Sequence, residues 1–372
     1  MNERILIIST VDDFHAYAVA KALEKKGTQP IFWHTSDFPA QGTESIQYSV
    51  GKRDIVINDS EIQMINPSFS TIWRRRPNST INNKILHPAD QRYAQYQCRG
   101  FRNSIYDILS PSAFWVNPRE RATQATSKII QHEAAVSVGL KTPATLYSND
   151  PERIREFIRA NNGTAAFKPL VPAFWHIDDY AYMNYTTFIG EKDLIEDDIL
   201  RQTPAIYQEP VPKSYELRIT MMGKRAFGAK ILSQQTKSGK TDWRCSYDEL
   251  QIEHWDVPDN LSELCSNLLQ KLGLVFGCFD FIVTPENEWI FLEVNQMGQF
   301  LFVEDRTKFP LLDAFAEFLI QGKVDFKWDK ATASLKYHDI IPEAEEMAKK
   351  ALEKHAIDKY KDESRKDEEQ IR

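Results

Sequence analysis

The chain has 372 residues and a formal net charge of −7, a length that accommodates two or three domains. Hydrophobic residues make up 42% of it and charged residues 27%, which is the composition of a globular protein with enough apolar material for a large core. The negative charge argues against a nucleic-acid-binding protein, and no apolar run reaches the roughly 20 residues that cross a bilayer. We therefore expect neither nucleic acid nor membrane as a partner.

Near the N-terminus, residues 5–9 form a short apolar run without a small-residue cleavage site. We interpret this run as a buried strand and not as a signal peptide. The cysteines have neither paired nor metal-binding spacing; they are Cys98, Cys245, Cys265 and Cys278. Free thiols in a reducing, cytoplasmic protein are the resulting expectation.

Residues 1–118 alternate between patterns typical of strands and of helices, which predicts an α/β unit with a mostly parallel sheet. Gly27 stands where the first helix would end. We expect strands at residues 5–9, 30–34, 55–57 and 71–73 and helices at residues 15–26 and 92–109.

Residues 119–205 predict a second, central unit. Its first helix would be ended by Gly139, and its second would begin at Asp150-Pro151. The expected order is a helix at residues 122–138, an extended segment at 143–147, a helix from 150 to about 162 and a strand at 165–168. Lys168 then stands at the end of that strand.

Residues 206–328 predict a third unit, of the α+β type, that is built on two hairpins. The hairpins would pair residues 216–222 with 226–232 and residues 279–283 with 289–295, and helices are expected at 261–272 and 309–321. From residue 342 onward the chain is dense in Glu, Lys and Asp. Residues 329–372 are therefore expected to be a charged tail, either helical or disordered.

Asp280, Glu293 and Asn295 lie on the two strands of the second hairpin. Glu293 and Asn295 are two residues apart and so point to the same face, and strand pairing would bring Asp280 beside them. Carboxylate and amide oxygens are the ligands that Mg²⁺ prefers, and Mg²⁺ commonly bridges nucleotide phosphates. The alternative is an ordinary polar face of a hairpin, but these residues interrupt very apolar strands.

Several cations accompany this acidic set and would offset the charge of a triphosphate. They are Lys128, Lys168, Arg218, Lys230 and Arg244. The segment from Tyr207 to Val211 is a candidate hinge between the two halves of a nucleotide cleft.

The order of these residues along the chain resembles that of the ATP-grasp superfamily, and more narrowly that of the microviridin-type ligases, which are also called graspetide synthetases. The similarity covers residues 1–328. The motifs that carry it are Trp73-Arg74-Arg75-Arg76-Pro77, Tyr207-Gln208-Glu209, Lys213-Ser214-Tyr215-Glu216-Leu217-Arg218, Asp242-Trp243-Arg244 and Phe291-Leu292-Glu293-Val294-Asn295-Gln296-Met297-Gly298-Gln299. The resemblance implies an ATP-grasp fold with an N-terminal parallel-sheet pre-ATP-grasp domain.

The resemblance also implies a role for each matching residue, with ATP and Mg²⁺ as cofactors. Lys128 and Lys168 would bind the α- and β-phosphates, and Arg218, Lys230 and Arg244 would face the γ-phosphate or an acyl phosphate. Glu209 and Val211 would lie at the adenine and Glu216 near the ribose, and Gln208 would also bind ATP. Asp280, Glu293 and Asn295 would hold Mg²⁺.

The family joins side chains of a ribosomally made precursor peptide, which has a leader and an acidic, hydroxyl-rich core, through ω-ester or ω-amide links. An Asp or Glu side chain is activated as an acyl phosphate, and a Thr, Ser or Lys side chain attacks it. The family also suggests a homodimer. Arg75 and Arg76 follow a predicted strand at the sheet edge where ligands bind in open parallel sheets. We expect them to steer an acidic peptide, and the alternative is a solvated basic turn.

Residues 170–185 depart from the superfamily, because they contain no glycine where many members have a glycine-rich loop over the phosphates. Either another segment covers the phosphates or this aromatic-rich stretch binds a peptide. Two other functions remain open from the sequence. One is an ATP-grasp ligase that adds amino acids to a protein or a small acid, and the other is a nucleotide-binding module without catalysis.

Overall fold

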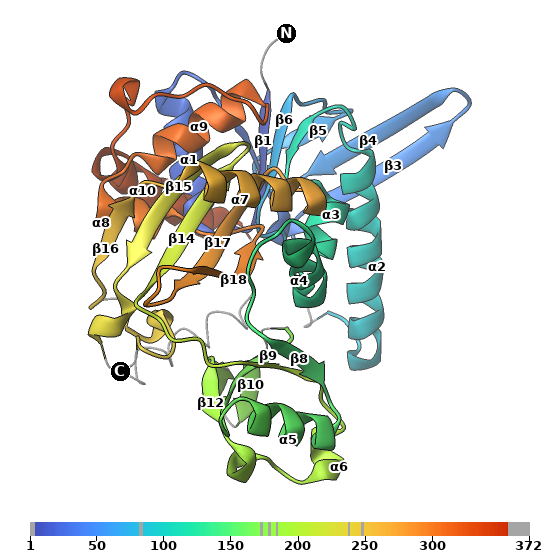
Figure 1. Cartoon of the computed structure of the whole chain (residues 1–372). Helices are drawn as coiled ribbons and strands as arrows, with labels where there is room; N and C mark the ends of the chain where they lie inside the picture. The colour runs from blue at the N-terminus through green and yellow to red at the C-terminus, as the bar shows by residue number, and fades with distance from the viewer. Residues whose placement is uncertain are drawn as a thin grey trace.

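The computed structural model of the chain describes residues 4–81, 85–171, 174–177, 180–183, 185–236, 239–246 and 249–355, and within 174–183 and 245–246 it describes the backbone alone. Figure 1 shows a large body of sheets and helices with a smaller subdomain below it. None of the helices in these ranges combines the length and the apolar character needed to cross a bilayer.

A parallel sheet forms the centre of the N-terminal unit. Its strands, in spatial order, are β2 (Ile31–His34), β1 (Ile5–Ser9), β6 (Thr71–Arg74) and β7 (Phe114–Val116), and each pair is parallel. Every residue of β1 is buried, as a continuous apolar run predicts for a central parallel strand. Helices α1 (Phe14–Lys25) and α2 (Pro88–Ile108) complete the unit, and the predicted parallel sheet is confirmed.

The prediction for residues 55–57 was wrong in one respect. They form part of a strand, β4 (Lys52–Asn58), but this strand belongs to a separate antiparallel sheet with β3 (Thr43–Ser49) and β5 (Gln63–Ile65). Only Val50 and Gly51 separate β3 from β4, whereas a parallel crossover needs a dozen or more residues. The resulting hairpin projects from the body (Figure 1).

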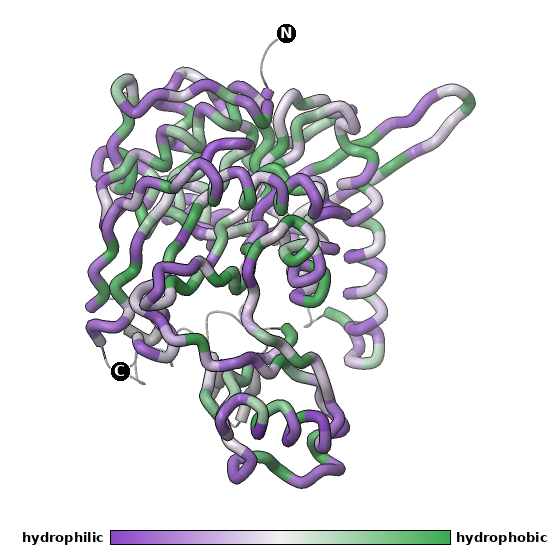
Figure 2. The backbone as a smooth tube through the Cα atoms, in the orientation of Figure 1, coloured by the Kyte–Doolittle hydropathy of each residue, from purple (hydrophilic) through white to green (hydrophobic). Residues whose placement is uncertain are grey.

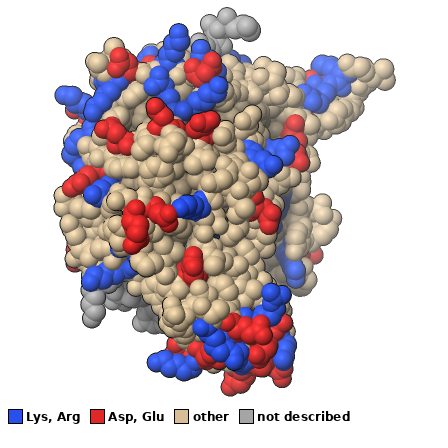
Figure 3. Space-filling model, in the orientation of Figure 1, with Lys and Arg blue, Asp and Glu red and all other residues tan. Residues whose placement is uncertain are grey.

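The central unit has its own small core beneath helix α5. Ile154 and Ile158 of this helix pack with Ala165 and Tyr207 of the adjoining sheet. Acidic and basic side chains gather over its lower surface (Figure 3). The elements are α3 (Arg119–Gln124), α4 (Lys128–Ser137), β8 (Thr145–Ser148), α5 (Pro151–Ala160), β9 (Ala165–Pro169), β10 (Phe174–Ile177), β11 (Tyr180–Met183), β12 (Thr187–Ile189), α6 (Asp197–Leu200) and β13 (Ala205–Gln208), with sheet order β12-β9-β13-β8.

The predicted continuous helix over residues 122–138 was also wrong, because the chain breaks between α3 and α4. The Ser127 side chain accepts a hydrogen bond from the backbone N–H of Ile130 at 3.4 Å and so caps the start of α4. Serine is among the residues that favour this capping position. As a result, Lys128 is the first residue of a helix and not a residue in the middle of one.

The C-terminal unit contains a five-stranded antiparallel sheet in which both predicted hairpins are confirmed. Figure 2 shows hydrophobic residues along its strands. In spatial order the strands are β16 (Ile252–Trp255), β15 (Arg225–Ile231), β14 (Tyr215–Met222), β17 (Phe276–Val283) and β18 (Trp289–Asn295), and the helices are α7 (Asp259–Leu272), α8 (Leu301–Thr307) and α9 (Leu311–Gln321). The two hairpins are joined through the pairing of β14 with β17.

One buried cluster unites the N-terminal and C-terminal units. It contains residues of α1 and β1 together with residues of α9 and of the five-stranded sheet, such as Ile7, Val19, Phe276 and Phe315. The proposed boundary at residue 118 therefore separates segments of chain that share a hydrophobic core. A second buried cluster, which includes Leu6, Trp33 and Tyr106, is made by the N-terminal unit.

The start of the charged tail is helical and docked. Helix α10 (Tyr337–Lys354) buries Ile340, Ala344 and Ala351, and these residues belong to the same core cluster as the buried face of α1. Hydrophobic side chains at this spacing lie on one face of a helix. The remainder of the predicted tail, residues 356–372, lies outside the described part of the chain.

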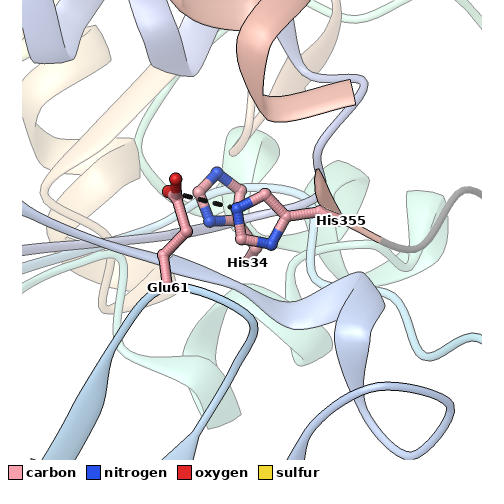
Figure 4. Close-up of side chains that lie close together, drawn as sticks. All are labelled: His34, Glu61 and His355. Carbon is pink, nitrogen blue, oxygen red and sulfur yellow. Dashed lines mark ion pairs between the residues drawn. The ribbon is translucent and has the colours of Figure 1, made fainter. Parts of the chain in front are cut away.

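His355, which directly follows α10, is buried against the N-terminal unit (Figure 4). Its Nδ1 lies 2.7 Å from Asp37 Oδ2, its Nε2 lies 3.2 Å from Glu61 Oε2, and its ring stacks on that of His34 with 3.7 Å between centroids. Burial lowers the pKa of His355, but the hydrogen bond to Asp37 and the other nearby carboxylates outweigh burial and raise it. Burial and the neighbouring His355 lower the pKa of His34 to about 3.

Candidate active site

The centre of the site is set by the pairing of three strands. Arg218 on β14 pairs with Asp280 on β17, and Asp280 pairs in turn with Glu293 on β18. Directly paired residues point to the same face of a sheet, so the three side chains form a row across it. Asn295 lies two residues beyond Glu293 and adds to the same face.

The distances within this acidic cluster, which we define as Asp280, Glu293 and Asn295, are those of direct hydrogen bonds. Asn295 Nδ2 donates to Asp280 Oδ2 at 3.2 Å and to Glu293 Oε1 at 3.1 Å. Arg218 Nη1 donates to both oxygens of Asp280, at 2.9 and 2.8 Å. Lys128 Nζ contacts Glu293 Oε2. The structure thus brings together the acidic residues and two of the predicted cations.

The two carboxyl groups differ in their ionisation. Burial raises the pKa of Asp280 more than the Arg218 guanidinium lowers it, and the charge of Glu293 raises it further. Burial also acts to raise the pKa of Glu293, but the Lys128 ammonium and the Asn295 amide outweigh burial and bring it to about 2. Glu293 is therefore the more permanent anion of the pair.

The acidic cluster fits a divalent cation by the chemistry of its donors. Two carboxylates and one amide within hydrogen-bonding distance of one another supply hard oxygen ligands, which Mg²⁺ prefers. The Asn295 amide donates through its nitrogen in the present arrangement, and a half-turn of the amide would place its oxygen there instead. Both carboxylates remain partly accessible, with side-chain exposures of 15% for Asp280 and 28% for Glu293.

Lys168 approaches the acidic cluster from the central unit. Its Nζ donates to Gln208 Oε1 at 2.7 Å, and Gln208 Nε2 donates to Thr145 Oγ1 at 3.0 Å. Burial lowers the pKa of Lys168, whereas the charges of Glu293, Asp242 and Glu216 act to raise it. Lys168 therefore senses carboxylates of the C-terminal unit, and the two units face each other here.

The predicted hinge connects β13 of the central unit to β14 of the C-terminal unit. Glu209 Oε1 accepts the backbone N–H of Ala144 at 2.9 Å. Val211 is half-buried on the connecting segment. Glu216 begins the C-terminal side, is buried, and pairs with Lys213 at 2.8 Å.

Arg244 and Lys230 differ in their relation to the acidic cluster. The Arg244 guanidinium forms two hydrogen bonds to Asp242, at 2.8 and 2.6 Å, and the side chain is 53% exposed. Lys230 pairs with Leu217, the neighbour of Arg218, so strand alternation places it on the opposite face of the sheet. There Lys230 Nζ lies 4.3 Å from the centre of the Tyr215 ring. The structure does not bring Lys230 to the acidic cluster.

Arg75 does not occupy the solvent-facing position that we expected of a peptide-steering residue. Its side chain is 1% exposed, and its Nε lies 2.8 Å from Asp13 Oδ2. Its Nη1 donates to the carbonyl of Met297 at 3.0 Å. The buried carboxylate of Asp13 accounts for this inward orientation. Arg76, the next residue, is exposed, and the side chains of residues 172–184, where we expected phosphate-covering or peptide-binding aromatics, lie outside the described part of the chain.

Sequence reasoning missed two buried amides beside the site, those of Asn117 and Gln131. Gln131 exchanges two hydrogen bonds with the backbone of Val294, and Asn117 donates to the carbonyl of Gln296. Their only trace in the sequence is a polar residue within an apolar stretch, such as the Asn that ends Phe114-Trp115-Val116-Asn117.

Residues 4–123 match the sequence profile of the MvdD pre-ATP grasp domain. A Chryseobacterium gregarium RiPP-associated ATP-grasp ligase, solved with ADP and a leader and core peptide, is 25% identical and has a TM-score of 0.79 over 90% of this chain and 100% of that one. The macrocyclase MdnC from Microcystis aeruginosa MRC, solved with its precursor peptide MdnA, is 27% identical with a TM-score of 0.74 over 86% of this chain and 99% of that one. No match was found among curated protein sequences.

The macrocyclase MdnB from the same Microcystis aeruginosa strain is also 27% identical, with a TM-score of 0.71 over 85% of this chain and 99% of that one. The structure is accordingly an ATP-grasp fold preceded by a parallel-sheet pre-ATP-grasp domain. The narrower resemblance to microviridin-type ATP-grasp ligases, which the motifs of the sequence indicated, is confirmed as well.

Proposed function

We propose that this chain is an ATP- and Mg²⁺-dependent ligase that forms ω-ester or ω-amide links within a ribosomally made precursor peptide, through an acyl-phosphate intermediate. The observation that carries the proposal is the acidic cluster with Arg218 and Lys128 bonded to it and Lys168 facing it. Similar solved structures also support the proposal, because they include a RiPP-associated ligase with ADP and peptide and a macrocyclase with its precursor.

In this proposal Asp280, Glu293 and Asn295 hold Mg²⁺, which supplies positive charge at the phosphates when it is bound. Lys128 and Lys168 contact the α- and β-phosphates. In the described structure these lysines bind protein oxygens, Glu293 and Gln208, and nucleotide oxygens would replace those partners. Arg218 remains on Asp280 and presents its charge to the γ-phosphate.

The segment between β13 and β14 would receive the nucleoside. Gln208 is hydrogen-bonded to both Lys168 and Thr145. It would therefore orient Lys168 toward the phosphates. The backbone from Glu209 to Val211 would hold the adenine, and Glu216 would bind the ribose. Arg244, whose guanidinium is oriented by Asp242, would lie at the acyl phosphate.

A carboxylate is a poor electrophile, and transfer of the γ-phosphoryl group to it creates a good leaving group. This transfer needs position and charge stabilisation more than covalent chemistry from the protein. A Thr, Ser or Lys side chain of the peptide then attacks the acyl carbon and releases phosphate. Closure of the central unit over the C-terminal sheet would exclude water, which otherwise hydrolyses the intermediate.

The peptide would supply both the activated carboxylate and the nucleophile. Arg76 is exposed at the carboxyl end of β6, and we assign it a contact with acidic residues of the peptide. Arg75 is given no such contact, because its guanidinium is buried against Asp13.

The test combines the purified chain with ATP, Mg²⁺ and each short peptide encoded beside its gene, followed by mass spectrometry. The proposal expects the peptide to lose one water per link while ADP and phosphate form. With ¹⁸O in the peptide carboxylates, one ¹⁸O should appear in the released phosphate, as an acyl phosphate requires. A gain of amino-acid mass would favour an amino-acid-adding ligase, and nucleotide binding without ADP formation would favour a non-catalytic module; either result overturns the proposal.

A further inference from the structure

Residues 294–299, which begin with the last two residues of β18 and continue past its end, contain one proposed metal ligand, Asn295, and adjoin another, Glu293. β18 is an edge strand of the five-stranded sheet, so one side of its backbone has no strand partner. Backbone groups buried without a partner are costly. Gln131 satisfies the unpaired side of β18 at Val294, and three more buried side chains bind backbone carbonyls of residues 296–299. We call residues 294–299 the ligand loop.

Gln131 of α4 acts at the start of the ligand loop. Its Oε1 accepts the backbone N–H of Val294 at 2.9 Å, and its Nε2 donates to the carbonyl of Val294 at 2.9 Å. The amide therefore makes the pair of bonds that a neighbouring strand would make. Val294 stands between Glu293 and Asn295, so this pairing fixes the backbone from which both side chains emerge.

Asn117, at the end of β7 in the N-terminal unit, acts two residues later. Its Nδ2 donates to the carbonyls of Gln296 at 2.8 Å and Phe276 at 2.9 Å. Its Oδ1 accepts the backbone N–H groups of Val275 at 2.8 Å and Phe276 at 3.0 Å. All four hydrogen-bonding positions of this amide are used, and they tie the first residue of β17 to the ligand loop.

Arg75, at the end of β6, acts at the far end of the ligand loop. Its Nη1 donates to the carbonyls of Met297 at 3.0 Å and Gly298 at 3.4 Å. Its Nε is held by Asp13, which also accepts the Ser9 hydroxyl at 2.6 Å. Arg218, already bonded to Asp280, donates through Nη2 to the carbonyl of Gln299 at 3.1 Å.

We propose that Arg75 and Asn117 are positioning residues that hold the ligand loop and so set Glu293 and Asn295 in the geometry that binds the metal ion. This inference rests on the proposed function and deepens it. It assigns the pre-ATP-grasp unit a part in the nucleotide site, because both residues directly follow the carboxyl ends of its parallel strands β6 and β7. Residues that orient metal ligands from behind typically change metal affinity or activity by about 10–100-fold when they are altered.

Arg75→Lys is the informative variant. It keeps a positive charge for the buried Asp13 carboxylate but loses the planar fork that reaches two carbonyls. The matched control is Arg225→Lys, because Arg225 also donates to a backbone carbonyl, that of Phe326 at 3.1 Å, away from the ligand loop. Asn117→Ser is a second variant, since it keeps one donor and removes the rest of the clamp. Thermal unfolding of all three establishes that they fold.

The first readout is independent of turnover: the affinity for Mn²⁺ in the presence of ADP, followed by the electron paramagnetic resonance of free Mn²⁺. We expect Arg75→Lys and Asn117→Ser to weaken Mn²⁺ binding by about tenfold or more, and Arg225→Lys to leave it unchanged. The second readout is ADP formation, in which the Mg²⁺ requirement should rise while the KM for peptide stays the same.

Folded variants with wild-type Mn²⁺ affinity would overturn the positioning role. A raised KM for peptide with an unchanged Mg²⁺ requirement would overturn it too, and would return Arg75 to peptide contact. A wild-type chain that binds Mn²⁺ and ADP but forms no ADP with any peptide would defeat the proposed function alone, because the Mn²⁺ readout would still decide the positioning role.

Discussion

The acidic cluster on β17 and β18 and the cluster around His355 both bring carboxylates together, but the charges of those carboxylates are balanced differently. At the acidic cluster, the guanidinium of Arg218 and the ammonium of Lys128 bind the carboxylates. At His355, one imidazole bridges Asp37 and Glu61 through its two nitrogens. The first arrangement leaves oxygen ligands that a metal ion can share with the cations, whereas the second uses both nitrogens of the ring and holds two segments together.

The acidic cluster therefore has the features of a binding site, whereas the His355 cluster has those of a structural contact. Figure 4 shows His34, Glu61 and His355 close together, a set that by composition resembles a metal site. However, the His34 and His355 rings are stacked at an angle of 27°, so their nitrogen lone pairs do not converge on one point. A protonated His355 between two carboxylates accounts for the same contacts without a metal ion.

The largest expected effect is at the acidic cluster itself. Glu293→Gln or Asp280→Asn should reduce Mg²⁺-dependent turnover by more than about 10²-fold, above the range typical of residues that only orient ligands, and should abolish Mn²⁺ binding. Asp256→Asn is the control, since Asp256 is fully exposed and pairs only with His254 among the residues described. A wild-type Mn²⁺ affinity in Glu293→Gln would mean that the metal binds elsewhere, and the His355 cluster would then be the first place to examine.

A smaller effect is expected at Lys168. Its pKa is lowered by burial, and it bonds to Gln208 at 2.7 Å. Lys168→Met should raise the KM for ATP by about tenfold, equivalent to about 1.4 kcal/mol, because one phosphate contact is lost while the acidic cluster stays intact. Initial rates of ADP formation at varied ATP measure this effect. An unchanged KM would remove Lys168 from the nucleotide site.

At the His355 cluster the expected effect is on stability and depends on pH. The pKa of His355 is raised in the folded state. Its contribution is therefore complete below the unfolded value of about 6.5 and declines as the pH rises through the raised folded value. The protection factors of the α10 amides, which are corrected for the faster intrinsic exchange at high pH, should be larger at pH 6 than at pH 9. His355→Gln should weaken docking by about 2 kcal/mol at pH 6 and remove most of this pH dependence.

That experiment also tests the contrast between the clusters. His355→Gln should leave Mn²⁺ affinity and ADP formation unchanged, because the residue lies at the other cluster. Protection of α10 that is independent of pH in the wild-type chain would contradict the ionic account of His355. Loss of Mn²⁺ binding in His355→Gln would show that this cluster is a metal site after all.

The smallest effect is expected at Lys230. The sequence placed it at the γ-phosphate, but strand pairing puts it opposite Leu217, over the ring of Tyr215. Lys230→Ala should change kcat/KM for ATP by less than about threefold, within 1 kcal/mol. A loss of about 10²-fold would show that Lys230 reaches the nucleotide, and that the face of the sheet was assigned wrongly.

The sequence predicts well those features that neighbouring residues encode. The two hairpins follow from alternating apolar strands around short turns, and they bring Asp280 beside Glu293 by pairing alone. The helix start at Ser127 was not predicted because an apolar pattern continues across the break between α3 and α4. The orientation of Arg75 was missed because its partners are set by tertiary packing, with Met297 lying 222 positions away in the chain.

The docking of α10 was likewise not predictable from its composition. Its charged residues face solvent while three buried side chains meet the core that the N-terminal and C-terminal units share, and its end is fixed by a contact between residues 318 positions apart. Asn117 and Gln131 belong to the same class, since an amide that clamps a distant backbone has no local signature. The fold and the acidic cluster were thus accessible from the sequence, and the supports around them were not.

The most direct test of the acidic cluster as the metal site is a crystal structure of the wild-type chain grown with Mn²⁺ and ADP, with anomalous diffraction used to locate the manganese. The account predicts an anomalous peak within coordinating distance of the oxygens of Asp280, Glu293 and Asn295, with phosphate oxygens of ADP on its other side. A peak at the His355 cluster alone, or ADP bound with no manganese beside β18, would contradict it.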